Sequence, residues 1–219
     1  TEFVLSHVPT NRKDRIQAIR NPDTDAETLK HVFDVDKHVT VIRALIERPD
    51  TPDQLLREIY DWSAETKDSK FGPLYEQSEQ ESEIYPENPK KQYEEYQSRY
   101  SILLTLTNRK LMPTELAEKI ALDERHDQGP ATLAANGLLS EQFILKIFVQ
   151  RPQVCRYFCV FPRNNTQAIR KALIEYLRQS QNLDALESFL VCQDPTPEEL
   201  TTLRQIFPSE WSSDRKSVV

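Results

Sequence analysis

The side chains in this sequence that are best suited to chemistry are a few histidines, cysteines and carboxylates that lie close together along the chain. His31 and His38 are seven residues apart, with Asp34 and Asp36 between them. Imidazole and carboxylate groups are both metal ligands. Aspartate, however, also favours helix ends and turns over helix interiors. We interpret the two aspartates as the break between two short helices, and the sequence predicts no metal site.

The charged segment DERHD, residues 123–127, holds the corresponding place in a later part of the chain. A carboxylate beside a histidine is a possible acid–base pair. Because the same kind of segment recurs where a helix is expected to end, its charges are better explained as another helix break. The sequence therefore predicts no catalytic residue here.

Cys155 and Cys159 lie one helical turn apart in the segment VCRYFCVF. A nearby cation such as Arg156 can lower the pKa of a thiol and make it reactive. The apolar neighbours, Phe158 among them, instead favour small buried hydrophobic residues, and we predict core cysteines. With Cys192 the chain has an odd number of cysteines, which is typical of reduced thiols in the cytoplasm.

Composition argues against several other classes of function. With only 3 glycines in 219 residues, a glycine-rich phosphate-binding loop is almost excluded, and the sequence has no HExxH, paired CxxC or GxSxG motif. The net charge of −7 makes nucleic acid an unfavourable partner, since phosphate groups require a basic face. No apolar run approaches the roughly 20 residues of a membrane span, and no signal peptide is visible. We expect a cytoplasmic protein without a cofactor.

The elements that position these residues follow from a repeated helix start. The segments RNPDTDAETLKHVF (20–33) and ERPDTPDQLLREIY (47–60) share Pro-Asp-Thr followed by a leucine-led amphipathic run. Six such starts can be aligned, and four of the five spacings between them lie between 25 and 31 residues. A period of this length is the signature of a repeat architecture. The starts are Asn21, Arg48, Asn108, Asn136, Phe161 and Cys192.

Each repeat is expected to consist of two short helices. In the clearest copy, Thr24 or Asp25 caps a helix that ends near residues 34–36, and a second helix over 37–48 stops before Pro49. Helices this short need a neighbour on each side. The apolar spacing predicts a core formed by Leu29, Val32, Phe33, Val39, Ile42, Leu45, Ile46, Leu55, Leu56, Ile59, Leu116, Ile120, Leu133, Phe143, Ile144, Ile147 and Phe148.

This pattern of helix, Asp-x-Asp break, second helix with V-x-x-x-R-A-L and then Arg/Asn-Pro-x-Thr-Pro resembles the variant leucine-rich repeat, a relative of HEAT and armadillo arrays. The match is closest over residues 15–60, and residues 122–148 resemble a second copy. The resemblance implies an all-α fold, a right-handed α-solenoid (superhelix) of about five or six short two-helix repeats over residues 1–219, with a polar tail at 208–219. Some family members carry an iron–sulfur cluster on a cysteine-rich segment that this sequence lacks.

Residues 61–98 interrupt the pattern and hold 10 acidic against 4 basic side chains. One interpretation is an acidic loop with a helical tail that leads into the next repeat. The other is a recognition element, because tyrosines offer a large contact area with a polar tip, and acidic surroundings would select a partner protein with a basic surface. The tyrosines predicted to bind such a partner are Tyr75, Tyr85, Tyr93 and Tyr96.

The recurring arginines, Arg43 and Arg48 above all, are a second candidate for partner binding. They could form a basic ladder on a concave face, or pair with carboxylates of adjacent repeats, and we favour the pairing. The predicted function is a non-catalytic scaffold for protein–protein interaction, acting as a monomer or as part of a larger chain. The alternative is a nucleic-acid-binding repeat protein or a HEAT-like enzyme, a DNA-base glycosylase or a bilin lyase. A glycosylase would need an aromatic-lined basic cleft, and Trp62 and Trp211 lie outside the regular repeats.

Overall fold

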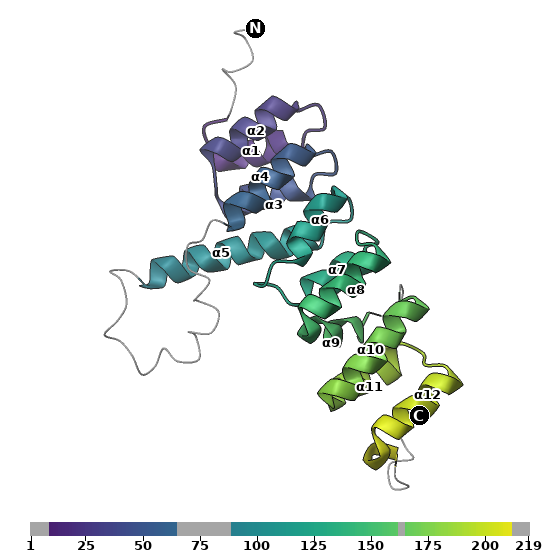
Figure 1. Ribbon diagram of the computed structural model, residues 1–219. Coiled ribbons are helices and arrows are strands. Elements are labelled where there is room, and N and C mark those ends of the chain that lie inside the picture. Colours follow the sequence, from purple (N-terminus) through teal and green to yellow (C-terminus); the bar gives the residue numbers. More distant parts are fainter. Residues whose placement is uncertain (1–8, 65–88, 162–164, 212–219) are drawn as a thin grey trace. The chain divides into compact units, whose positions relative to one another are not determined.

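The structure is a computed structural model that describes residues 9–64, 89–161 and 165–211, without the side chains of 89–96. Within these ranges the chain forms twelve α-helices and two 3₁₀-helices and no strand (Figure 1). The predicted all-α class is therefore confirmed for this part of the chain. The helices fall into two compact units, residues 1–126 and residues 127–219. The prediction of one continuous superhelix over both stays a prediction.

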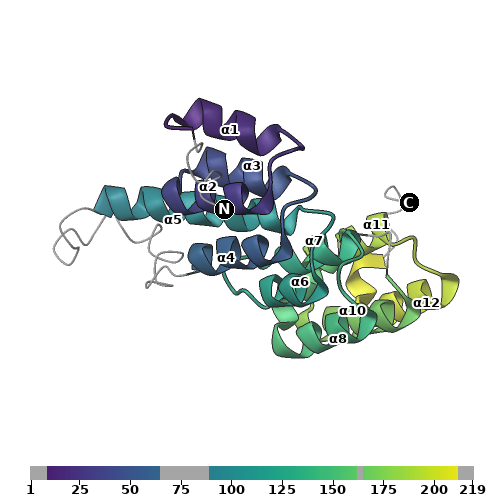
Figure 2. The ribbon, with the colours of Figure 1, turned by 90° about the horizontal axis from the view of Figure 1, so that it is seen from above.

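The first unit contains six α-helices, and α3 lies at its centre. It packs against α1 on one side and α5 on the other, and it also contacts α2. Figure 2 shows α1, α3 and α5 in succession. The bounds are α1 Arg12–Arg20, α2 Ala26–Val35, α3 Val39–Glu47, α4 Asp53–Ala64, α5 Pro89–Thr107 and α6 Thr114–Ala121.

The second unit also contains six α-helices, and α8 and α10 pack against each other within it. Phe148 and Phe158 meet edge to face, with ring centroids 4.8 Å apart. The bounds are α7 Gly129–Ala135, α8 Glu141–Gln150, η2 Pro152–Val154, α9 Cys155–Phe158, α10 Gln167–Ser180, α11 Leu183–Cys192, α12 Pro197–Ile206 and η3 Pro208–Trp211.

The repeated Pro-Asp-Thr segment makes the same turn twice. The Oγ1 of Thr24 donates to the carbonyl of Ala18 at 2.6 Å, and the Oγ1 of Thr51 donates to the carbonyl of Leu45, again six residues earlier. Each threonine thus holds the turn against the helix that precedes it. Asp25, not Thr24, caps α2 by accepting from the backbone N–H of Thr28.

Fifteen of the seventeen predicted core residues are buried, and two are only half-buried. Val39 is the first residue of α3, directly after the exposed cap residue His38, so it lies at the edge of the core. Phe143 lies in the first turn of α8, and the ammonium of Lys146 lies 5.9 Å from the centroid of its ring. The helical period therefore predicted which helix faces are buried. It did not predict that Val39 and Phe143, in the first turns of their helices, are only half-buried.

The predicted insertion, residues 61–98, overlaps the end of one helix and the start of another. Residues 61–64 complete α4, and residues 89–98 belong to α5, so the expected helical tail is confirmed. Trp62 therefore lies inside a regular helix, where its ring centroid is 6.4 Å from that of Phe33. The predicted insertion therefore starts too early at residue 61, because the packing of Trp62 on α2 is not visible in the local sequence.

The predicted burial of Cys155 and Cys159 is confirmed. Burial raises the pKa of each thiol to about 12, because a thiolate would lose its hydration in this core. Both cysteines consequently behave as small hydrophobic residues. Separately, none of the described helices has the length and apolar character needed to cross a membrane.

A candidate binding surface at the ends of α1, α3 and α5

His38, Asp34 and Asp36 each have a different partner in the first unit. His38 caps α3, and its Nδ1 accepts from the backbone N–H of Thr40. Asp34 pairs with Lys30, whereas Asp36 is buried and accepts from the Arg15 guanidinium at 2.8 Å. Among the residues that the structure describes, no group of three or more His, Cys, Asp or Glu side chains could hold a metal ion.

Asp123 and Arg125 of the DERHD segment also stabilise the fold of the first unit. Asp123 binds the guanidinium of Arg125, which in turn donates to the carbonyl of Ser63 at 2.7 Å. Burial opposes ionisation of Asp123, but the hydrogen bonds and charge of Arg125 outweigh it, and its pKa lies below the usual value. The hydroxyl of Tyr60 donates to the same carboxylate at 3.1 Å, which links α4 to this turn.

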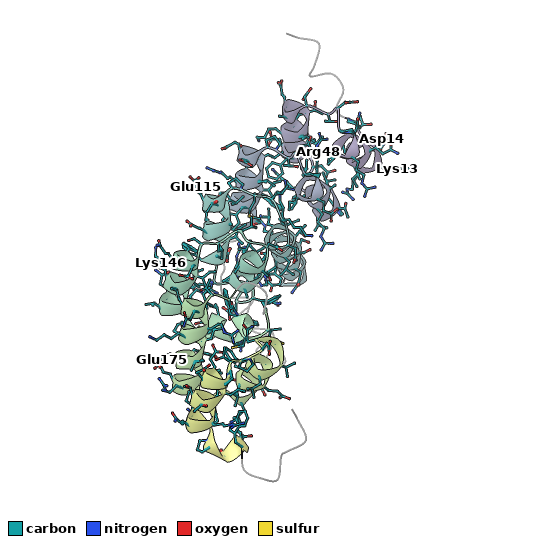
Figure 3. All side chains as sticks on the ribbon, turned by 90° about the vertical axis from the view of Figure 1, so that its right-hand side faces the viewer. Lys13, Asp14, Arg48, Glu115, Lys146 and Glu175 are labelled. Atoms are coloured by element: carbon teal, nitrogen blue, oxygen red, sulfur yellow. The ribbon has the colours of Figure 1, made fainter. Side chains whose placement is uncertain are left out.

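Arg48 shows how the chain uses its recurring arginines. It is the residue after α3 and only 7% exposed, and Figure 3 labels it among the helices of the first unit. Its Nη1 donates to the carbonyls of Ile19 and Asn21 at 2.7 and 2.6 Å, and its Nη2 to those of Pro22 and Thr24. We call a side chain that donates to several carbonyls at the end of a neighbouring helix a carbonyl clamp.

Asp50 completes this first clamp. Its two carboxylate oxygens accept from Nε and Nη2 of Arg48, each at 2.7 Å. This bidentate hydrogen bonding holds the pKa of Asp50 below its usual value. The buried guanidinium thus donates to main-chain carbonyls at the end of α1 and in the turn that follows it, and its charge is balanced by Asp50 in the turn that follows α3.

Arg109 forms the equivalent clamp between α5 and α3. It lies just after α5 and donates to the carbonyls of Ile46, Arg48 and Pro49, at the end of α3. Its Nε donates to the carbonyl of Leu111. The ends of α1, α3 and α5 are therefore joined in series, because each clamp binds the end of the helix before it.

The second unit uses a glutamine in the same way. Gln193 follows α11 and is 3% exposed. Its Nε2 donates to the carbonyls of Phe158 and Cys159 at 3.1 Å, at the end of α9. Arg170 donates to the carbonyl of Gln193 at 2.6 Å and is bound by Glu199. Carbonyl clamps thus occur in both units, and the predicted pairing of arginines with carboxylates accounts for only part of the arginine contacts.

Two pockets lie beside the first two clamps. The first pocket, about 280 Å³, lies between the ends of α1 and α3, and the second, about 350 Å³, lies between the ends of α3 and α5. Glu47 and Pro49 line both, so the pockets adjoin. The first pocket is lined by Ile19, Arg20, Pro22, Ala44, Glu47, Arg48, Pro49 and Asp50, and the second by Ile46, Glu47, Pro49, Thr105, Asn108, Arg109, Lys110 and Leu111.

The residues predicted to bind a partner do not gather at one described site. Arg43 is exposed and donates to the hydroxyl of Ser101, whereas Arg48 is buried, which argues against a direct contact with a partner. Tyr75 and Tyr85 lie outside the described residues. Tyr93 and Tyr96 lie in the first part of α5, residues 89–96, where the backbone alone is described. Partner binding by these six residues stays a prediction.

Sequence reasoning missed Arg109 and Leu111 as candidate site residues. The signal is the distance to the next proline: Arg48 lies four residues before Pro52 and Arg109 four residues before Pro113, one place away from the alignment of Arg48 with Asn108 given above. With the two prolines aligned, Leu111 stands where Asp50 stands in the earlier turn. Comparison of the chain with protein-family models, with curated proteins and with solved structures gives no match.

Proposed function

We propose that this protein is a non-catalytic scaffold that binds a partner protein, and that the two adjoining pockets of the first unit are its contact surface. The observation that carries the proposal is their repetition: two adjoining hollows lie at the ends of α1, α3 and α5, each beside an arginine clamp. A row of adjoining hollows suits an extended chain, whose side chains recur at a fixed spacing.

Rigidity of the surrounding backbone supports the same proposal. The carbonyl clamps of Arg48 and Arg109 fix the main chain on the walls of both pockets. A preformed surface loses little conformational freedom when it binds, and affinity gains accordingly. The polar groups that an enzyme would need, such as Asp123 and the two buried thiols, are instead engaged in packing and structural hydrogen bonds.

The test compares which proteins are retained by four immobilised forms of the chain. Glu47→Trp places a bulky side chain at the boundary of both pockets, and Lys13→Trp is the matched control on an exposed part of α1. In the fourth form a short Gly–Ser linker replaces residues 66–87, which keeps α4 and α5 intact. Quantitative mass spectrometry then measures the bound proteins.

We expect a partner to be retained by the wild type and by Lys13→Trp and to be lost from Glu47→Trp. Loss only from the form without residues 66–87 would move the contact to the tyrosine-bearing insertion and leave the scaffold function standing. If none of the four forms retains a protein reproducibly, the scaffold proposal is wrong.

A further inference from the structure

The pocket between α3 and α5 differs from its neighbour at one residue of the clamp. In the turn after α3, Asp50 binds Arg48 through two hydrogen bonds of 2.7 Å. In the turn after α5, the residue at the corresponding place is Leu111, which offers Arg109 only its main-chain carbonyl. The Leu111 side chain is 68% exposed and lines the pocket.

This exchange leaves the Arg109 cation less satisfied than the Arg48 cation. A guanidinium has five N–H groups, and the four hydrogen bonds of Arg109 all go to carbonyl oxygens. Within the described residues, no carboxylate forms an ion pair with it, and the second N–H on Nη2 has no acceptor. Burial lowers the pKa of Arg109, whereas Asp50 and Asp53 act on it only from longer range and raise it.

The walls of the same pocket are largely apolar. Ile46, Pro49 and Leu111 contribute aliphatic surface, and the volume is about 350 Å³. The exposed Lys110 adds a second cation directly beside Arg109. Glu47 lies at the boundary with the neighbouring pocket, so the positive side of the hollow is the side of α5. The pocket is thus lined by apolar side chains, by the two adjacent cations Arg109 and Lys110, and by one carboxylate, Glu47.

From this arrangement we infer that the pocket between α3 and α5 binds an acidic, apolar segment of a partner protein: a leucine or phenylalanine side chain enters the hollow, and a neighbouring aspartate or glutamate of the same segment binds Arg109 and Lys110. The partner's carboxylate supplies the opposite charge that Asp50 supplies at the first clamp, and it accepts one hydrogen bond, from the remaining N–H on Nη2 of Arg109. This inference rests on the proposed scaffold function and names the chemistry of its partner.

An acidic peptide fits this pocket better than a nucleic acid does. Phosphate groups would also bind Arg109 and Lys110, but they would leave the apolar walls without a partner. The net charge of −7 opposes a polyanion along the rest of the surface. A short peptide needs only the two adjacent cations and an apolar anchor, because a few anchor residues carry most of the binding free energy of an interface.

The test uses peptides of defined chemistry and the full chain. Three fluorescein-labelled twelve-residue peptides in a Gly–Ser host carry Leu-Glu-Glu, Leu-Lys-Lys or Ala-Glu-Glu, and a fluorescent oligo-dT is the nucleic-acid probe. Anisotropy measures affinity, and amide chemical shifts of ¹⁵N-labelled protein locate the site, because NMR detects complexes with dissociation constants of about 1 mM. We expect only the Leu-Glu-Glu peptide to bind, with shifts at residues 105–111.

Two substitutions form the matched pair. Leu111→Asp supplies the missing clamp carboxylate and should weaken binding of the Leu-Glu-Glu peptide at least tenfold. Val149→Asp places the same carboxylate at an exposed apolar position of α8 that lines neither pocket, and it should leave the affinity within about twofold. Circular dichroism checks that both variants keep their helices.

Each possible result either supports or overturns the inferred binding of an acidic, apolar segment. Equal binding of the Leu-Lys-Lys peptide, unchanged affinity in Leu111→Asp, preferential binding of oligo-dT, or shifts elsewhere would overturn the inference. So would the absence of any binding by the Leu-Glu-Glu peptide. If Leu111→Asp has no effect while protein capture still depends on Glu47, the inference fails and the scaffold function survives. If capture fails in all forms, the scaffold function itself fails.

Discussion

At the end of α3 the clamp arginine is buried and held by a carboxylate of its own turn, whereas at the end of α5 the equivalent arginine is half-buried and has only carbonyl acceptors. Both arginines secure the helix before them, so their structural task is the same. The difference between Asp50 and Leu111 decides whether the arginine has a carboxylate partner within its own turn. Where the carboxylate is present the cation is internal to the fold, and where leucine replaces it the cation faces a hollow with apolar walls.

The largest expected effect comes from removing the first clamp. Arg48→Met should lower the free energy of unfolding by about 3 kcal/mol, since four main-chain carbonyls lose their donor and Asp50 loses its partner. Urea denaturation monitored by circular dichroism measures it. A loss below about 1 kcal/mol would mean that water replaces the guanidinium with little penalty.

Removing the second clamp should be less damaging. Arg109→Met is expected to lower the free energy of unfolding by about 1.5 kcal/mol, because its contact with the Arg48 carbonyl is only part-buried and that with the Pro49 carbonyl is exposed, so that water can reach both oxygens. The same denaturation experiment applies. Equal losses in Arg48→Met and Arg109→Met would break the comparison between the two clamps.

The two threonines of the repeated turn provide a finer comparison. Thr51→Val should cost about 1 kcal/mol, because Thr51 is buried and the carbonyl of Leu45 would lose its donor. Thr24→Val should cost about 0.5 kcal/mol, since Thr24 is only half-buried and water can reach the carbonyl of Ala18. Thermal unfolding of the two variants ranks them, and the reverse order would show that exposure does not govern the cost.

Leu111→Asp should make the second clamp resemble the first. We expect a gain of about 0.5 kcal/mol in the free energy of unfolding, which a half-exposed ion pair with Arg109 can supply. Raising the salt concentration should remove this gain, because exposed charges are screened. Destabilisation at low salt would mean that the turn after α5 cannot place a carboxylate as the turn after α3 does.

Of the clamps after α3 and α5, only the first contains a carboxylate that acid can protonate, and this is the smallest expected effect. Hydrogen bonding from Arg48 lowers the pKa of Asp50 in the folded state, so its contribution is present above the unfolded pKa of about 4 and is lost as the pH falls through the folded pKa. Asp50→Asn should therefore reduce the loss of stability between about pH 6 and pH 3. If it instead leaves the pH dependence unchanged, Asp50 does not report on the clamp.

The sequence predicts much of this fold because apolar spacing and turn-forming residues are recognisable among residues that lie close together in the chain. Ile42, Leu45 and Leu56 follow the helical period and are fully buried. The partners of Arg48 could not be predicted in the same way, since main-chain carbonyls belong to every residue and leave no trace in the sequence. The start of the insertion at residue 61 was misjudged for a related reason: the contact of Trp62 with Phe33 joins two helices that the local pattern treats separately.

The carbonyl clamps also determine how freely different positions can change over evolutionary time. The acceptors at Asn21 and Pro22 are peptide oxygens that any amino acid would supply, whereas the donor must be one long side chain with several N–H groups. Substitutions in the turn should therefore be tolerated while substitutions of Arg48 are not. Half of this contact between α1 and α3 is independent of sequence, so the turn can diversify while the helices stay in register.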